Sequence, residues 1–392
     1  MCYAESRNGF DWEKPKFGFT SYLEDKGNGC NKNNIVYNNS VNGGHPYSGG
    51  TVFKDPNGSA EERYKLIYLT WIKEKPQVRG AVSADGIHWT PIDKPLLDGY
   101  CSDTQTTAYY DAHLKCYGGY FRYWSGSPWF ESWATWQGSR SWRRQIGRAV
   151  STDFRHWSNP ESVLSLGVNH HPSHDLYTNA HTVYEDIHFM FPAQYNREKD
   201  ITEVYLATSR DGIHWEYFGE SPVLPVGERG SGEEGQIYAV CGLVPLGKDK
   251  IAVSYGVSYL THNQYNPYAL DAAGVERKFA HLAWAMWEKD RLVAIEAAED
   301  GRFTLIPLIH HEKQLVLNVS TETAGEVRVQ LRNEKGEVIK GRAFSDCEPI
   351  TGDRPEAIVS WQGSANISDT AGQVIQVDIN LRIAKIFTFQ FQ

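Results

Sequence analysis

The sequence predicts an all-β protein: a five-bladed β-propeller followed by a β-sandwich. A seven-residue motif recurs, reading SRNGFDW at 6–12, SADGIHW at 83–89, STDFRHW at 151–157 and SRDGIHW at 209–215. Each copy follows a short run of small and apolar residues that is typical of a strand. A spacing of roughly 60–75 residues fits one four-stranded blade per repeat. A different, strictly alternating pattern begins near residue 301.

The motif itself predicts a hairpin turn. Its Asp or Asn can bond the backbone two residues further on, and its Gly can take a positive φ. Its Trp begins the returning strand by packing on the sheet. We therefore assign the Asp and Trp of the motif, such as Asp211 and Trp215, to structure rather than to function.

Each unit opens with a polar residue followed by a strand-like run. Such openings occur at residues 45–53, 103–110, 175–184 and 233–240. Together with the partial unit around the first motif, they predict five blades over residues 1–300. The first motif has almost no strand before it. We therefore expect the first blade to lack its inner strands, which would make the chain an N-terminally shortened version of a longer protein.

From residue 301 to 392, apolar and polar residues alternate with a period of two in short runs such as 326–331 and 374–379. Turns that contain Gly, Asn or Asp separate these runs. This alternation predicts a small antiparallel β-sandwich. The segment has few aromatic residues that would be exposed. We interpret it as a structural buttress and not as a sugar-binding module.

Composition and net charge limit the classes of partner that we expect for this protein. The net charge of −9 argues against nucleic acid or an anionic membrane as a partner. The aromatic content of 13% is high and would allow stacking on sugar rings. No run is apolar enough to span a bilayer, and the oligomeric state stays open. No signal peptide is visible, so we expect a cytoplasmic protein as written, or a secreted or periplasmic one if the N-terminus is incomplete. The six scattered cysteines and the histidines around residues 170–174 show no metal-ligand spacing, so we predict neither metal nor cofactor.

The candidate site follows from the topology. The first strand of each blade lines the propeller channel, so the residues that open the units should converge at one mouth. Carboxylates crowded there would push their pKa values apart, as glycoside hydrolysis requires. We name Asp103, Asp175 and Glu234 as catalytic candidates. The substrate-binding candidates are His45, Gln105, Arg122, Trp124, Tyr177, Asn179, Glu233, Gln236 and His262.

Structural interpretations compete with each of these. Asp103 could cap a turn, Asp175 could accept bonds from backbone amides in the channel, and Glu233 with Glu234 could belong to a solvated loop. Arg122 could lie on an outer strand. Asp55 follows its strand instead of preceding it, which predicts a turn residue.

Several segments together resemble a known family. They are FKDP at 53–56 with ERYK at 62–65, the repeated motif, Asp103-x-Gln105, DLYTN at 175–179 and the C-terminal sandwich. They resemble bacterial glycosidases related to the five-bladed propeller glycoside hydrolases of families 32 and 43. The resemblance implies an acid Glu, a base or nucleophile Asp and a further Asp, which would be Glu234, Asp103 and Asp175. The Trp-x-Asn-Asp-Pro, Arg-Asp-Pro and Glu-Cys signatures of those families are absent, which leaves the individual roles open.

We therefore expect a glycoside hydrolase that cleaves a poly- or oligosaccharide. Two alternatives remain. One is a polysaccharide lyase that uses His45 or His181 with Tyr177 as base and acid. The other is a propeller that binds carbohydrate without catalysis. The motif also resembles the Asp-box of sialidases, but the sequence does not identify the arginine triad and tyrosine nucleophile that a sialidase needs.

Overall fold

The computed structural model describes residues 1–19, 33–38, 48–126, 129–130, 142–167, 170–264 and 280–392. It divides the chain into two compact units, residues 1–247 with 252–285, and residues 248–251 with 286–392. Almost all regular structure is β, as predicted. Among the described residues, none forms a helix with the length and apolar character that a membrane crossing requires.

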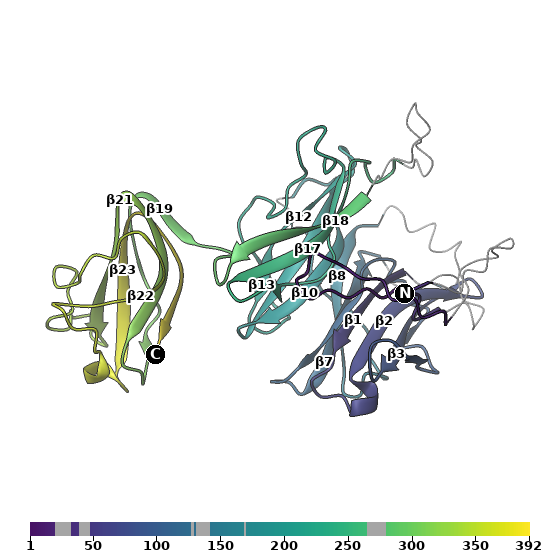
Figure 1. The fold of residues 1–392 in the computed structure, drawn as a ribbon, viewed down its shortest axis with the longest axis horizontal. Coiled ribbons are helices and arrows are strands. Elements are labelled where there is room, and N and C mark those ends of the chain that lie inside the picture. The colour runs from purple at the N-terminus through teal and green to yellow at the C-terminus, as the bar shows by residue number, and fades with distance from the viewer. Residues whose placement is uncertain (20–32, 39–47, 127–128, 131–141, 168–169, 265–279) are drawn as a thin grey trace. The chain divides into compact units, whose positions relative to one another are not determined.

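The first unit repeats one antiparallel sheet. The first two sheets consist of β1 (Ser48–Lys54), β2 (Tyr64–Ile72), β3 (Lys75–Ser83), β4 (Trp89–Pro91) and β5 (Leu97–Asp98), and of β6 (Thr107–Asp111), β7 (Cys116–Trp124), β8 (Arg144–Ser151) and β9 (Glu161–Leu164). Strands β1 to β4 and β6 to β9 pair with their neighbours in chain order, as in the blades of a propeller, and β5 pairs with β3; β1, β2 and β3 lie side by side in Figure 1.

The next two repeats are joined edge to edge. The third contains β10 (His174–Tyr184), β11 (Ile187–Asn196), β12 (Ile201–Val204), β13 (Ala207–Ser209) and β14 (Glu216–Tyr217), and the fourth β15 (Gln236–Ala239), β16 (Val244–Pro245), β17 (Lys250–Ser258) and β18 (Ala280–Glu288). A parallel pairing of Thr202 with Gln236 links β12 to β15. Within the described residues this gives one nine-stranded sheet; its two halves, β10–β14 and β15–β18, are called the third and fourth sheets below.

The motif turns have the predicted local structure. In the copy at 209–215, Asp211 Oδ1 accepts the backbone N–H groups of Ile213 and His214, both at 2.8 Å. The indole N–H of Trp215 donates to the carbonyl of Gly212 at 3.2 Å. Gly212 has a φ of 70°, which explains the glycine. The assignment of the motif to structure is confirmed.

The motif turns and the openings of the units lie at opposite ends of the sheets. In the first sheet Ser83, where the motif begins, pairs with Tyr64 at the start of β2. Ser48, which opens the unit, pairs with Leu69 near the end of β2. The motif turns therefore lie at one end of the sheets. The openings of the first strands lie at the other end, together with the ends of the second strands.

The first motif copy forms a hairpin with one strand segment beside it. Glu5 bridges Glu13 across the turn, and Cys2 bridges Ile35. The Trp284 indole on β18 donates to the carbonyl of Gly9 at 2.9 Å. The expectation that the first blade lacks its inner strands remains a prediction. The number of blades remains a prediction.

The second unit is a five-stranded antiparallel sheet of β19 (Ile295–Thr304), β20 (Leu308–Ile309), β21 (Leu315–Asn333), β22 (Asp353–Ile358) and β23 (Val374–Phe391). The register of β21 against β23 shifts between Thr321 and Glu326. Residues from both halves of these two long strands enter one core around Trp361. The unit begins before the predicted boundary at residue 300 because β19 pairs with β23. Its role as a buttress remains a prediction.

Asp55 is a structural residue, as its place after a strand suggested. Its Oδ1 accepts the N–H of Asn57 at 2.9 Å. Its Oδ2 lies 2.9 Å from the ammonium of the buried Lys65 and accepts the Tyr117 hydroxyl at 2.8 Å. The carboxylate thereby ties the first sheet to the second.

Candidate functional site

Polar and aromatic side chains from three sheets meet at the end where the units open. They come from the loop before β6, the end of β7, the start of β8, the start of β10, the end of β11, β15 and the loop after β17. We call this group the Tyr177 cluster; it consists of Asp103, Arg122, Trp124, Arg144, Asp175, Tyr177, Tyr195, Arg197, Asp200, Gln236, Tyr238 and His262.

Arg122 links the second sheet to the third. Its side chain is fully buried, and its Nη1 lies 3.0 Å from Asp103 Oδ1. Its Nη2 donates to the carbonyl of Tyr177 at 2.5 Å, and the Thr104 hydroxyl donates to the same carbonyl at 2.8 Å. The loop that carries Asp103 is thus fixed against β10. The Asp103 carboxylate keeps 21% of its side-chain surface exposed, so it is accessible to a ligand.

Asp175 is enclosed by arginine. It is 1% exposed, and its Oδ2 lies 2.9 Å from Arg144 Nη1 and 2.8 Å from Arg197 Nε. Its Oδ1 accepts the backbone N–H of Arg144 at 3.3 Å. A carboxylate in this setting holds two guanidinium groups in place. The structure therefore supports a positioning role for Asp175.

Two guanidinium groups pack on the Tyr177 ring. The Arg122 and Arg144 Cζ atoms lie 4.5 and 5.0 Å from the ring centroid. The same two atoms lie 5.4 and 5.2 Å from the Trp124 ring. Burial, and after it the charge of Arg122, lowers the pKa of Arg144. Trp124 is 1% exposed, so its ring supports the arginines and is not open to a sugar.

The fourth sheet contributes His262 and Tyr238. The His262 ring lies 4.5 Å from Tyr177. Its Nδ1 lies 3.2 Å from the Tyr238 hydroxyl and 3.3 Å from Gln236 Oε1. Burial, and after it the charge of Arg144, lowers the pKa of His262. The imidazole is therefore neutral near pH 7 and able to accept a proton.

The His262 loop is anchored by Asp200. Asp200 lies in the turn between β11 and β12, and its carbonyl accepts the N–H of His262 at 2.9 Å. Its carboxylate accepts the Tyr195 hydroxyl at 2.7 Å and the backbone N–H of Asn263 at 2.9 Å. Burial, and after it the bond to Asp200, raises the pKa of Tyr195 to about 12.

Sequence reasoning missed Arg144, Arg197, Tyr195 and Asp200. It considered mainly the residues that open each unit, together with Arg122 and Trp124 at the end of one second strand. The four that it missed lie at the start of a third strand, at or just after the end of another second strand, and in the turn that follows. Antiparallel pairing brings these places to the same end of the sheet, as the pairing of Trp124 with Arg144 shows. Combining that rule with the predicted strands would have nominated Arg144.

Glu234 does not join the Tyr177 cluster by direct contact. Its two carboxylate oxygens accept the N–H groups of Gly230 at 3.1 Å and Gly232 at 2.8 Å. Backbone N–H groups of its own loop lower its pKa. Glu233 lies 3.6 Å from His281. In the part of the chain that the structure describes, neither Glu has a hydrogen bond or ion pair to the cluster.

The remaining candidates have varied surroundings. The Gln105 amide donates to the carbonyl of Val240. Asn179 is 1% exposed, and its amide nitrogen has no acceptor among the described residues. His45 lies outside the described residues. No group of three or more His, Cys, Asp or Glu residues able to hold a metal ion occurs in the described ranges.

His181, the other base considered for a lyase, is a half-buried residue that packs among other rings. Its Nε2 lies 3.1 Å from His188 Nδ1, and its ring packs 4.5 Å from Tyr109 and 6.1 Å from Trp215. Trp215 belongs to a motif turn, so His181 lies toward the end of the sheets opposite to the Tyr177 cluster. Burial lowers its pKa well below the usual value.

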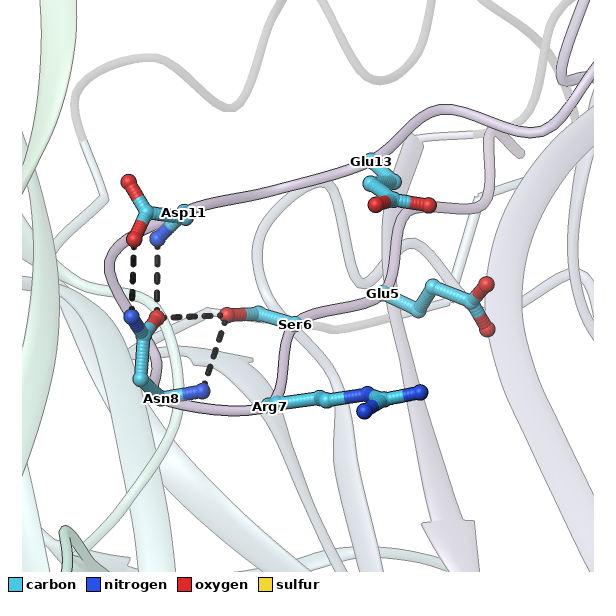
Figure 2. Close-up of a pocket in the computed structure, with 6 residues that line it drawn as sticks. All are labelled: Glu5, Ser6, Arg7, Asn8, Asp11 and Glu13. Atoms are coloured by element: carbon cyan, nitrogen blue, oxygen red, sulfur yellow. Dashed lines mark hydrogen bonds between the residues drawn. The ribbon is translucent and has the colours of Figure 1, made fainter.

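A separate hollow adjoins the first motif turn (Figure 2). There Asn8 Oδ1 accepts the backbone N–H of Asp11 at 2.9 Å, and Asn8 Nδ2 donates to Asp11 Oδ2 at 2.8 Å. Glu5 and Glu13 face each other across the hairpin. The polar groups of the turn satisfy one another, which is the structural role of the motif.

No family model and no curated protein matches the chain. Solved structures similar to it include a glycoside hydrolase (15% identity, 72% of this chain and 76% of that one, TM-score 0.45). They also include a glycosyl hydrolase from Bacteroides ovatus (12% identity, 61% and 65%, TM-score 0.39). A third is an N-acetylgalactosamine deacetylase from F. plautii in complex with blood group B trisaccharide (14% identity, 65% and 93%, TM-score 0.33). At these TM-scores the similarity carries no argument about the reaction, which has to be argued from the side chains.

Proposed function

We propose that this protein is a carbohydrate-active enzyme that hydrolyses a glycosidic bond of a poly- or oligosaccharide at the Tyr177 cluster. The observation that carries the proposal is the convergence of three sheets on one end. There the partly exposed Asp103 carboxylate lies close to Arg122, and Tyr177, Tyr238 and His262 pack together. Aromatic faces combined with a few fixed polar groups are what sugar sites use.

In this mechanism Asp103, whose partly exposed carboxylate lies beside Arg122, serves as the base or nucleophile. Asp175 holds Arg144 and Arg197 in position. Glu234 is the acid. In the free chain its carboxylate accepts the N–H groups of Gly230 and Gly232, which favour the ionised form, so on sugar binding Glu234 has to leave these groups and take up a proton from solvent before it can protonate the leaving oxygen. Catalytic hydrogen bonds often form only in the complex with substrate.

The test is sugar release from a panel of oligosaccharides by wild-type protein, Asp103→Asn and Glu234→Gln. We expect both variants to lose at least about a hundredfold in turnover, the range typical of a missing acid–base group, while thermal unfolding and circular dichroism stay close to wild type. Unchanged turnover in both variants would remove the hydrolase proposal.

One observation favours a lyase as the second candidate function. Asp175 is occupied by arginine and Glu234 by backbone N–H groups, whereas Tyr177 lies between neutral His262 and the guanidinium groups of Arg122 and Arg144. In a β-elimination one group removes the proton next to the sugar carboxylate, the bond to the leaving oxygen breaks, a carbon–carbon double bond forms, and a second group protonates the leaving oxygen. His262 and Tyr177 would take these roles.

The two reactions give different products. A lyase product absorbs ultraviolet light through its new double bond, and a hydrolysis product does not. Under the lyase proposal Tyr177→Phe abolishes the absorbance change. Binding of sugars by calorimetry without any turnover would instead support a propeller that binds carbohydrate and does not cleave it.

A further inference from the structure

The Tyr177 cluster gathers positive charge in an acidic protein. The chain carries a net charge of −9, yet Arg122, Arg144 and Arg197 meet here. Asp103 and Asp175 are the carboxylates that pair with them. The next carboxylate, Asp200, accepts hydrogen bonds from Tyr195 and Asn263 instead of from an arginine. Among the described residues, three guanidinium groups therefore share two carboxylates through direct ion pairs.

Donors in the same place lack acceptors. Among the described residues, Arg122 Nε and Nη1 and Arg144 Nε are buried without a hydrogen-bond partner; Nη1 has only its ion pair with Asp103. A buried donor without an acceptor destabilises a fold. Native structures keep an unsatisfied buried group where it has a functional role or where water or an ion satisfies it. The side chains of Arg144 and Arg197 keep 17% and 33% of their surface exposed, so a ligand can reach them.

We propose, resting on the carbohydrate function above, that the sugar recognised here is acidic: a uronate whose carboxylate binds Arg144 and Arg197. Planar guanidinium groups fit a carboxylate through paired N–H donors. The rings of Tyr195 and Tyr238 lie 5.8 and 5.9 Å from the ring of Tyr177. The half-buried Tyr177 and Tyr238 provide apolar surface for the sugar ring, whereas the buried Tyr195 and Arg122 support the site from behind.

The experiment measures binding and does not depend on turnover. Isothermal titration calorimetry compares methyl α-galacturonide with methyl α-galactoside, which differ only in the carboxylate, with sodium acetate as a plain-anion control. The variants are Arg144→Gln, Arg144→Lys and Arg197→Gln. The matched control is Arg155→Gln, whose partly exposed guanidinium pairs with Glu62 next to a motif turn. Thermal unfolding verifies that each variant is folded.

We expect wild-type protein and Arg155→Gln to bind the galacturonide about tenfold or more tightly than the galactoside, as one charge-assisted pair provides. Arg144→Gln and Arg197→Gln should each lose most of this preference, and Arg144→Lys should retain part of it. Equal binding of both sugars, equal binding of acetate, no binding of the galacturonide, or a preference that survives in both glutamine variants would overturn the inference. Turnover of neutral oligosaccharides alongside any of these results would leave the hydrolase proposal standing.

Discussion

Replacing Asp175 by Asn tests the interpretation of this residue as the anchor of two arginines. The substitution keeps the shape of the side chain and removes its charge. It also turns an amide N–H₂ toward the donors of Arg144 and Arg197, which lie 2.9 and 2.8 Å from the native oxygen. Two buried guanidinium groups then share no carboxylate.

The magnitude follows from burial. Removing one partner of a buried ion pair destabilises a protein by about 3–5 kcal/mol. Arg144 and Arg197 keep 17% and 33% of their side-chain surface exposed, so water compensates part of the loss, and we expect about 3 kcal/mol. At about 2–4 °C per kcal/mol for a large domain, Tm should fall by about 6–12 °C.

The assay is thermal unfolding followed by circular dichroism. The matched control is Asp98→Asn, which removes a surface pair with Lys75 whose side chains are 49% and 33% exposed. Such a pair contributes about 0–1 kcal/mol. In addition, Arg197→Gln in the Asp175→Asn background should destabilise less than Arg197→Gln alone, because contacting residues couple. If Asp175→Asn unfolds at the same temperature as Asp98→Asn, the anchoring argument is wrong.

Three further outcomes follow from the fold. Asp211→Ala should lower the free energy of unfolding by about 1 kcal/mol. Asp211→Asn should stay near wild type, because Asn8 accepts the equivalent backbone bonds in the first motif. Denaturant titrations of the two variants measure the difference, and equal losses of stability would contradict the prediction. Burial holds the pKa of His181 below its unfolded value near 6.5, so the unfolded chain takes up the proton first as the pH drops. Stability should therefore fall below about pH 7 by up to about 1.4 kcal/mol per pH unit. His181→Phe should reduce this slope, measured from unfolding midpoints between about pH 7.5 and 5.5, and an unchanged slope would refute the view that His181 is kept neutral by burial. Lys65→Met should destabilise the fold by about 3 kcal/mol, since it leaves Asp55 buried and only partly paired. A change below about 1 kcal/mol by denaturant titration would show that Lys65 does not compensate the buried Asp55 carboxylate.

Local chemistry explains why so much of the fold could be predicted. The motif turns depend on contacts within seven residues, so Asp211, Gly212 and Trp215 carry the turn in their own sequence. Repetition of that turn then predicts repeated sheets. Asp103 and Tyr177, which open two of the units, could be predicted because the order of strands in a repeat determines which strand ends lie at the same end of the sheet.

The all-β class, the repeated hairpin and the end of the sheets that carries the candidate site are all encoded in local patterns of residues. Which side chains meet at that end depends on tertiary packing. Arg122 contacts the carbonyl of a residue 55 positions away, and Asp175 takes Arg144 and Arg197 as partners. These pairings depend on how neighbouring sheets pack against each other, and no local pattern encodes that packing. Asp175, a catalytic candidate in the sequence, is therefore enclosed by arginine in the fold.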